Sequence, residues 1–209
     1  MKKLAIIAMT IFAIGAKAQE KSSTTTAIQS GTWNTQANLN FFSSNQENNQ
    51  AEVSNSNFGL NATFGYAVSK NLEIGLGAGY NTNTTENKLL TNTNEITRRD
   101  FTINAYIKKY VFIIPNLALT AQGTISYGGG VMEYNNDTTQ DDLTTYAIQL
   151  VPGLSYFATE HLAITAQIGN ISYRHTKTEF QNIPEPVKRD DFGVNLNMSN
   201  ITLGIAYYW

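Results

Sequence analysis

The segment Asn57–Tyr80, NFGLNATFGYAVSKNLEIGLGAGY, contains the pattern that decides the predicted fold. Apolar side chains occupy every second position on both sides of a short break at Ser69–Asn71, and glycine or mostly polar residues fill the positions between them. Successive side chains of a β-strand point to opposite faces, so this period of two predicts strands with one apolar and one polar face. The segment therefore predicts an antiparallel hairpin with a tight turn.

The same alternation recurs in segments about ten residues long, which is the length of a tilted membrane-spanning strand. Eight segments are predicted as strands: Thr32–Phe41, Asn57–Val68, Leu72–Tyr80, Phe101–Lys109, Leu117–Tyr127, Tyr146–Tyr156, Leu162–Tyr173 and Ile201–Trp209. The apolar phase changes at Gly169-Asn170 and near Ser199-Asn200. We expect a β-bulge at each place, because one extra residue turns the following side chains to the other face.

The connections between these strands alternate in length. Three are short, namely Ser69–Asn71, Phe112–Asn116 and Phe157–His161, and four are long and polar, namely Ser43–Ser56, Asn81–Arg99, Gly128–Thr145 and Arg174–Asp191. Alternating short and long connections are typical of transmembrane barrels. The sequence therefore predicts an all-β fold: an eight-stranded antiparallel up-and-down transmembrane β-barrel over residues 32–209, with short periplasmic turns and four longer extracellular loops.

A soluble β-sandwich or lipocalin would also show alternating strands, but two features favour the membrane barrel. Charged residues make up only 14% of the chain. Aromatic residues also gather at both ends of the predicted strands: Phe41, Phe58, Tyr80, Phe101, Tyr127, Tyr146 and Tyr173 at one end, and Trp33, Tyr66, Tyr156, Tyr207 and Trp209 at the other. Two such rings are typical of the girdles that a barrel places at the two membrane interfaces.

Residues 1–18 are predicted to be a cleaved secretory signal peptide. Two lysines precede the apolar run Leu4–Ala16, which is shorter than the roughly 20 apolar residues that a transmembrane helix needs. The predicted cleavage site consists of Ala16, Ala18 and Gln19, with Gln19 as the first mature residue. Residues 19–31 are predicted as a polar lead-in to the barrel domain, and the expected location is the bacterial outer membrane.

The composition excludes several classes of function. The chain has no cysteine, which excludes a lipid-modified N-terminal cysteine, disulfides and thiolate metal sites. Loss of the three lysines of the signal peptide leaves 14 − 3 = 11 basic against 16 acidic residues, a net charge of −5. An acidic chain has no electrostatic surface for nucleic acid. The sequence indicates no metal site and no cofactor.

Four segments resemble the small outer-membrane β-barrels of the OmpA/OmpX type, especially the barrel-only "outer membrane protein beta-barrel domain" (porin-family) proteins of Bacteroidetes. They are Phe64–Val68, Asn71–Gly77, Pro152–Phe157 and Asn200–Trp209. The resemblance implies an outer-membrane location and a C-terminal signal that the barrel-assembly machinery reads. The residues that match this signal are Ile201, Leu203, Ile205, Tyr207 and Trp209. Fold resemblance alone is poor evidence for activity.

Catalysis is not expected. The two histidines, His161 and His175, are predicted at opposite ends of the barrel and cannot share a site, so the base and nucleophile of an enzyme are missing. Glu73 and Lys108 are the charged residues that most clearly face the predicted lumen, near the same end of neighbouring strands. We expect them to form a structural pair; a proton or ion relay is the alternative.

An eight-stranded barrel is only just wide enough for its own side chains. We therefore expect a structural or surface-interaction barrel with a largely filled lumen, and the alternative is a narrow, low-conductance channel for small solutes. The expected partners are outer-membrane lipids, the assembly machinery and an extracellular partner bound through the loops. The expected state is a monomer.

Overall fold

The computed structural model describes residues 27–47, 51–89, 92–134, 140–180, 185–195 and 201–209. The predicted cleavage site (Ala16, Ala18 and Gln19) and the predicted bulge at Ser199-Asn200 lie outside these residues. The described residues form ten strands: β1 (Trp33–Glu47), β2 (Ala51–Ser69), β3 (Leu72–Leu89), β4 (Asn92–Ile114), β5 (Leu117–Tyr134), β6 (Gln140–Phe157), β7 (Leu162–Ile168), β8 (Asn170–Glu179), β9 (Val187–Asn195) and β10 (Ile201–Tyr208). Within these ranges no helix is long and apolar enough to cross a lipid bilayer.

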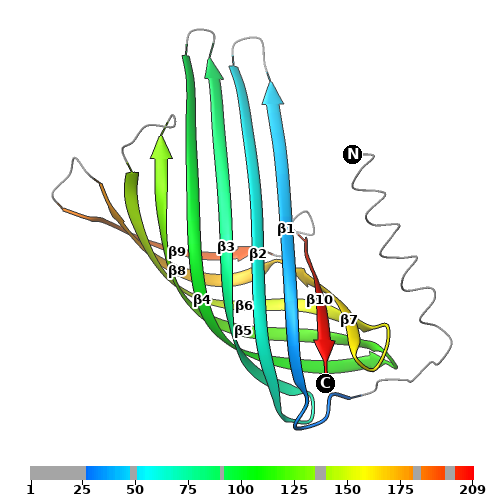
Figure 1. Cartoon of the computed structure of the whole chain (residues 1–209). Coiled ribbons are helices and arrows are strands. Elements are labelled where there is room, and N and C mark those ends of the chain that lie inside the picture. Colours follow the sequence, from blue (N-terminus) through cyan, green and yellow to red (C-terminus); the bar gives the residue numbers. More distant parts are fainter. Residues whose placement is uncertain (1–26, 48–50, 90–91, 135–139, 181–184, 196–200) are drawn as a thin grey trace.

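All ten strands belong to one antiparallel sheet, as the alternation predicts. Strands β1 to β6 pair in sequence order, β6 pairs with β7, β7 pairs with β10, and β10 pairs with β1. These pairings close into a cycle. The last residue lies beside the start of β1, where the Trp33 backbone N–H donates to the Trp209 carbonyl over 2.9 Å (Figure 1).

The sequence predicts eight strands and the described residues form ten, because one predicted strand is divided in two and a further strand, β9, precedes the last one. The predicted strand Leu162–Tyr173 is divided at Gly169, whose φ of 66° breaks the extended backbone. Its first part, β7, pairs with β10, whereas β8 pairs with β9. Strand β9 precedes β10 and begins inside a segment that is predicted as a loop.

The prediction of four long loops is wrong, because the chain continues there as long β-hairpins. Strand β3, for example, runs on to Leu89 and stays in register with β4. Polar side chains bond across the hairpins: Thr84 Oγ1 lies 3.1 Å from Thr97 Oγ1, and Asn45 Nδ2 donates to Glu52 Oε1 over 3.1 Å. β-Branched and paired polar residues support strands without an apolar face, so polarity alone did not distinguish hairpin from loop.

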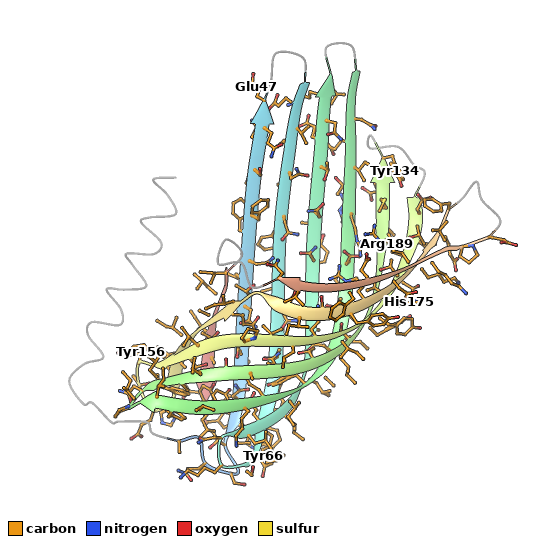
Figure 2. All side chains as sticks on the ribbon, turned by 180° about the vertical axis from the view of Figure 1, so that it is seen from behind. Glu47, Tyr66, Tyr134, Tyr156, His175 and Arg189 are labelled. Atoms are coloured by element: carbon orange, nitrogen blue, oxygen red, sulfur yellow. The ribbon has the colours of Figure 1, made fainter. Side chains whose placement is uncertain are left out.

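The opposite end of the sheet has short turns. Strands β2 and β3 are joined through Asn71 with φ 61°, and β4 and β5 through Asn116 with φ 70°. Asparagine accepts this left-handed backbone conformation better than most residues do. We call this the short-turn end and the other the hairpin end; Figure 2 shows Glu47 at the hairpin end of β1 and Tyr66 near the short-turn end of β2.

The sheet is apolar on its outer face and mostly polar on its inner face. Along β1, Asn34, Gln36 and Asn38 are buried, whereas the residues between them are exposed. The exposed fraction reaches 68% for Phe41, which in a water-soluble domain would normally be covered. Other exposed apolar residues include Leu76, Phe101, Ile103, Ile148, Phe192 and Leu203. This inversion indicates a sheet whose outer face is covered by an apolar solvent.

Candidate functional site

The interior at the short-turn end is filled by an apolar cluster, which we call the apolar seal. It consists of Ile28, Ala67, Tyr110, Ala118, Phe157, Ala163, Ala206 and Tyr208. The ring of Phe157 lies 5.3 Å from that of Tyr208 and 5.5 Å from that of Phe112, between centroids. These residues come from six strands and from the chain before β1, so the seal extends across the interior.

The described part of the predicted lead-in takes part in this seal and is not merely a polar connection. The Ile28 backbone N–H donates to Asn71 Oδ1 over 2.8 Å, and the Ile28 carbonyl accepts from the Asn71 N–H over 2.9 Å. This pair of bonds attaches the lead-in to the β2–β3 turn. The Ile28 side chain is thereby buried against the end of the sheet.

Next to the seal lies a buried polar cluster that we define as Gln36, Glu73, Tyr106 and Lys108, joined to the seal through Tyr110. The Glu73 carboxylate accepts the Tyr106 hydroxyl at 2.5 Å and the Tyr110 hydroxyl at 2.8 Å. The Tyr110 and Tyr208 hydroxyls lie 3.0 Å apart. Hydrogen bonds to a carboxylate are shorter and stronger than those between neutral groups, so these two bonds fix the positions of both tyrosine side chains.

Lys108 is held by different partners. Its Nζ donates to Gln36 Oε1 over 2.8 Å and lies 5.0 Å from the centroid of the Tyr110 ring, a cation–π distance. Gln36 Nε2 in turn donates to Asn38 Oδ1 over 2.6 Å. Lys108 on β4 is therefore linked to β1 by this hydrogen bond, and its ammonium also contacts the Tyr110 ring on its own strand.

The predicted pair of Glu73 and Lys108 lies where the sequence places it, but its contacts differ from those of a simple ion pair. The two residues face each other in the β3–β4 register, and only 2% and 3% of their surfaces are exposed. Among the described residues the two charged groups form no direct ion pair, and Tyr110 contacts both. Sequence reasoning missed the role of Tyr110, although it continues the inward face of Tyr106 and Lys108 by one more step of two.

Two inward-facing glycines make room for the Tyr106 ring. A Cβ atom on Gly75 would lie 2.6 Å from the ring, and one on Gly65 would lie 2.3 Å from the tyrosine hydroxyl. Real Cβ atoms do not make contacts this short, so a side chain at either position would displace the tyrosine. The glycines therefore determine where the polar cluster can form.

The hairpin half of the interior is open, so the lumen is filled at one end only. It holds a cavity of about 620 Å³, which we call the vestibule. Amide side chains dominate its wall: Asn38, Asn40, Asn57, Asn61, Asn81, Asn83, Asn104, Gln122, Gln149 and Gln167. Three of them form a ladder, in which Asn40 donates to Asn57 over 2.9 Å and Asn57 donates to Asn81 over 3.1 Å.

The vestibule offers hydrogen bonds and few charges. Its charged lining residues are Arg98, Asp100 and Arg174, and Arg98 Nε donates to Asp100 Oδ2 over 2.8 Å. Neutral amides both donate and accept hydrogen bonds, so this wall suits water and small uncharged polar solutes. The described residues contain no group of three or more side chains that could hold a metal ion.

A comparison with known families identifies what this closed sheet is. Residues 4–208 match the family described as outer membrane protein beta-barrel domain. The chain belongs to this family. It is a bacterial outer-membrane protein, as the sequence predicts, and its exposed apolar face is the surface of an outer-membrane barrel.

One solved structure supports the fold, and two others are less similar. OprG of Pseudomonas aeruginosa, an outer membrane protein, is similar at a TM-score of 0.50 and 11% identity, over 87% of this chain and 97% of that one. Neisserial surface protein A has a TM-score of 0.47 and 13% identity, over 88% of this chain and 99% of that one. The N-terminal β-barrel domain of Pseudomonas aeruginosa OprF has a TM-score of 0.42 and 11% identity, over 87% of this chain and 100% of that one. No curated protein matches the sequence.

The five residues of the predicted assembly signal all lie on the lipid-facing side of the barrel. Ile201, Leu203, Ile205, Tyr207 and Trp209 are exposed. Strand β10 joins β7 to β1, so it closes the barrel. Recognition of these residues by the assembly machinery stays a prediction.

The two histidines of the barrel lie at opposite ends. His161 Nδ1 is 2.7 Å from the Tyr208 carbonyl oxygen at the short-turn end. His175 Nδ1 is 2.8 Å from Asp190 Oδ1 on the β8–β9 hairpin, and the Tyr173 hydroxyl donates to the same oxygen over 2.6 Å. The sequence did not indicate the contact between His175 and Asp190, because it depends on the β8–β9 register. Figure 2 labels His175 and Arg189 on this hairpin.

The contacts of the Asp190 carboxyl on this hairpin are expected to depend on pH. The Tyr173 hydroxyl, followed by the His175 ring, holds the pKa of the Asp190 carboxyl below its ordinary value. A lowered pKa stabilises the folded form above the ordinary pKa, and this stabilisation is lost as the pH falls through the folded value, so the contact should fail only in acid. Tyr173→Phe should raise the pKa of Asp190 in an NMR titration, whereas Tyr146→Phe, a matched control, should leave it unchanged. An equal pKa in all three proteins would contradict this assignment.

Proposed function

We propose that this outer-membrane barrel has a structural or surface-interaction role and that its lumen is closed to solutes at the short-turn end. The observation that carries the proposal is the double layer at that end, in which the apolar seal lies against the buried polar cluster. A carboxylate and an ammonium that are both nearly unexposed leave no continuous water path beside them. Charged groups in a water-filled channel would be solvated instead.

We place the short-turn end in the periplasm and the hairpins outside the cell. The support is the rule that outer-membrane barrels have short periplasmic turns and longer extracellular connections. Beyond Tyr80, strand β3 continues from Asn81 to Leu89, which corresponds to roughly 30 Å of strand. Hairpins of this reach present polar side chains well away from the membrane, where an extracellular partner would bind them.

The proposed barrel has eight spanning strands in the manner of the OmpA/OmpX type. In this proposal β7 and β8 are two parts of one strand, as are β9 and β10, and the cycle β1 to β7 and β10 surrounds the lumen. It acts without catalysis, as a monomer among outer-membrane lipids. Its hairpins, and not its lumen, carry the interaction.

Cysteine labelling tests the closed lumen directly, because the natural chain has no cysteine. Thr124 lines the vestibule and Ser155 is fully buried on the inner face nearer the short-turn end. A membrane-impermeant maleimide should label Thr124→Cys in the folded barrel, and it should label Ser155→Cys only after unfolding. Similar labelling rates for the two folded variants would contradict the proposal.

A narrow channel is the second candidate, and the vestibule is the observation that favours it. Planar-bilayer recordings with the unmodified barrel distinguish the two functions. A closed barrel should give no stable openings, and a channel should give small, reproducible current steps together with swelling of liposomes in small sugars.

A further inference from the structure

The vestibule has the shape of a binding pocket. At its inner end the wall residue Asn38 accepts a hydrogen bond from Gln36 of the buried polar cluster, and the apolar seal lies beyond this cluster. A solute that enters from the hairpin end therefore meets a floor. The volume of about 620 Å³ lies within the range of ~300–1,000 Å³ that is typical of small-molecule sites.

The amide ladder on the wall of this pocket has a free acceptor at one end and a free donor at the other. Asn40 Nδ2 donates to Asn57 Oδ1 and Asn57 Nδ2 donates to Asn81 Oδ1, so the two bonds fix the orientation of all three amides. Among the described residues nothing donates to Asn40 Oδ1 and nothing accepts from Asn81 Nδ2. Both residues are only partly exposed, so these two groups need partners inside the vestibule.

Gly59 leaves the space that the ladder occupies. It stands between Asn40 and Asn81 in the register of β1, β2 and β3. A Cβ at this position would overlap with Asn40 Oδ1 and lie 3.1 Å from Asn81 Oδ1. The φ of Gly59 lies outside the left-handed region, so the backbone itself does not require a glycine there. The ladder explains this glycine, and the two amides meet above it.

The charges of the wall favour a neutral ligand. Arg98 and Asp100 bind each other, which leaves the exposed Arg174 as the remaining charge of the described lining. An ionised ligand would exchange its hydration for contacts with neutral amides, which is unfavourable. A sugar offers neutral hydroxyls, and each hydroxyl both donates and accepts hydrogen bonds as an amide does.

We propose that the vestibule binds a small neutral sugar, a role that rests on the proposed closure of the lumen and adds to the surface interaction of the hairpins. One hydroxyl donates to Asn40 Oδ1, and a neighbouring hydroxyl accepts from Asn81 Nδ2. Because both amides lie close to Gly59, one sugar ring reaches both groups. A solute with a single hydroxyl satisfies only one end of the ladder, whereas adjacent hydroxyls satisfy both.

NMR of the full barrel in a detergent without sugar groups tests this site. Titration with sucrose, a neutral disaccharide, should give saturable shifts of the side-chain amide signals of Asn40, Asn57 and Asn81. Asn57→Leu removes both ladder bonds and should weaken binding about tenfold, because the free acceptor and donor lose their fixed orientation. Asn45→Leu, the matched control, removes an amide that bonds to Glu52 outside the vestibule and should bind like the natural chain.

Asn57→Asp keeps the test decisive if Asn57→Leu does not fold. It has the same shape but replaces the donor to Asn81 by an acceptor, so it should also weaken binding. Affinity equal to that of the natural chain in both variants, or no saturable shift in the natural chain, would overturn the site. Binding of glucuronate in place of sucrose would overturn the neutral class of ligand. Entry of sucrose into sealed liposomes would overturn the proposed closure, whereas absent shifts without entry would overturn the site alone.

Discussion

Glu73→Ala should lower the free energy of unfolding of the barrel by about 3–5 kcal/mol, because it removes the acceptor of two buried hydroxyls and leaves a buried ammonium without a nearby counter-charge. The hydroxyls belong to Tyr106 and Tyr110, and the ammonium to Lys108. Urea unfolding in lipid vesicles, followed by tryptophan fluorescence, measures the loss. The natural tryptophans, Trp33 and Trp209, both lie at the short-turn rim.

A double-mutant cycle separates the charge from the hydrogen bonds. Glu73→Gln and Lys108→Met should each destabilise the barrel, and the double variant should be more stable than the sum of the two losses predicts, with a coupling of about 1–3 kcal/mol. Residues that did not interact would give additive losses. Additivity would show that the two groups, which Tyr110 separates, do not interact despite their register.

Gly75→Val should prevent most of the protein from reaching its folded form. A Cβ at this position would lie 2.4 Å from the Phe64 carbonyl oxygen and 2.6 Å from the Tyr106 ring. The first belongs to a paired strand and the ring is only 6% exposed, so neither has room to move away. Overpacking of a core usually costs about 1–3 kcal/mol, and a clash with a paired strand backbone adds to this cost. The gel mobility of unheated samples, which differs between folded and unfolded barrels, measures the folded fraction.

Gly123→Val is the control for this substitution. Gly123 lies on the outer face of β5, where a Cβ would meet only Ile107 Cγ2 at 3.4 Å, so both variants lose one glycine but only one meets an obstacle. We expect Gly123→Val to fold nearly as well as the natural chain. Equal folded fractions for the two valine variants would show that Tyr106 can take another position.

The spanning part of the barrel could be predicted from the sequence because lipid outside and side chains inside impose opposite chemistry on alternate residues. Leu72 to Tyr80 follow this rule. Ile201 to Trp209 follow it on the outer face, whereas their inner positions include Ala206 and Tyr208 of the apolar seal. Beyond Tyr80 polar residues occupy both faces of β3 up to Lys88, so the alternation ends although the strand continues. The period-two pattern stops at Tyr80, so it predicts a loop at Asn81–Leu89, where the structure has a strand.

The sequence could predict which side chains face the interior, but not which of them contact one another. Period two places Glu73 and Lys108 on the inner face, and the tight β2–β3 turn places them near one end. Which groups touch depends on the register and on partners far away in sequence, such as Gln36 on β1 and Tyr208 on β10. The division at Gly169 and the docking of Ile28 on Asn71 depend on the same long-range geometry.

The composition of the seal also bears on the order of assembly. Its members come from the residues before β1, from β2, β4, β5, β6 and β7, and from β10, the last strand of the chain. Contacts between such distant parts of a chain form late, because every intervening segment must be placed first. The seal is therefore completed by the same step that joins β10 to β1, so a fully closed ring with an unfilled short-turn end is not an expected intermediate of insertion.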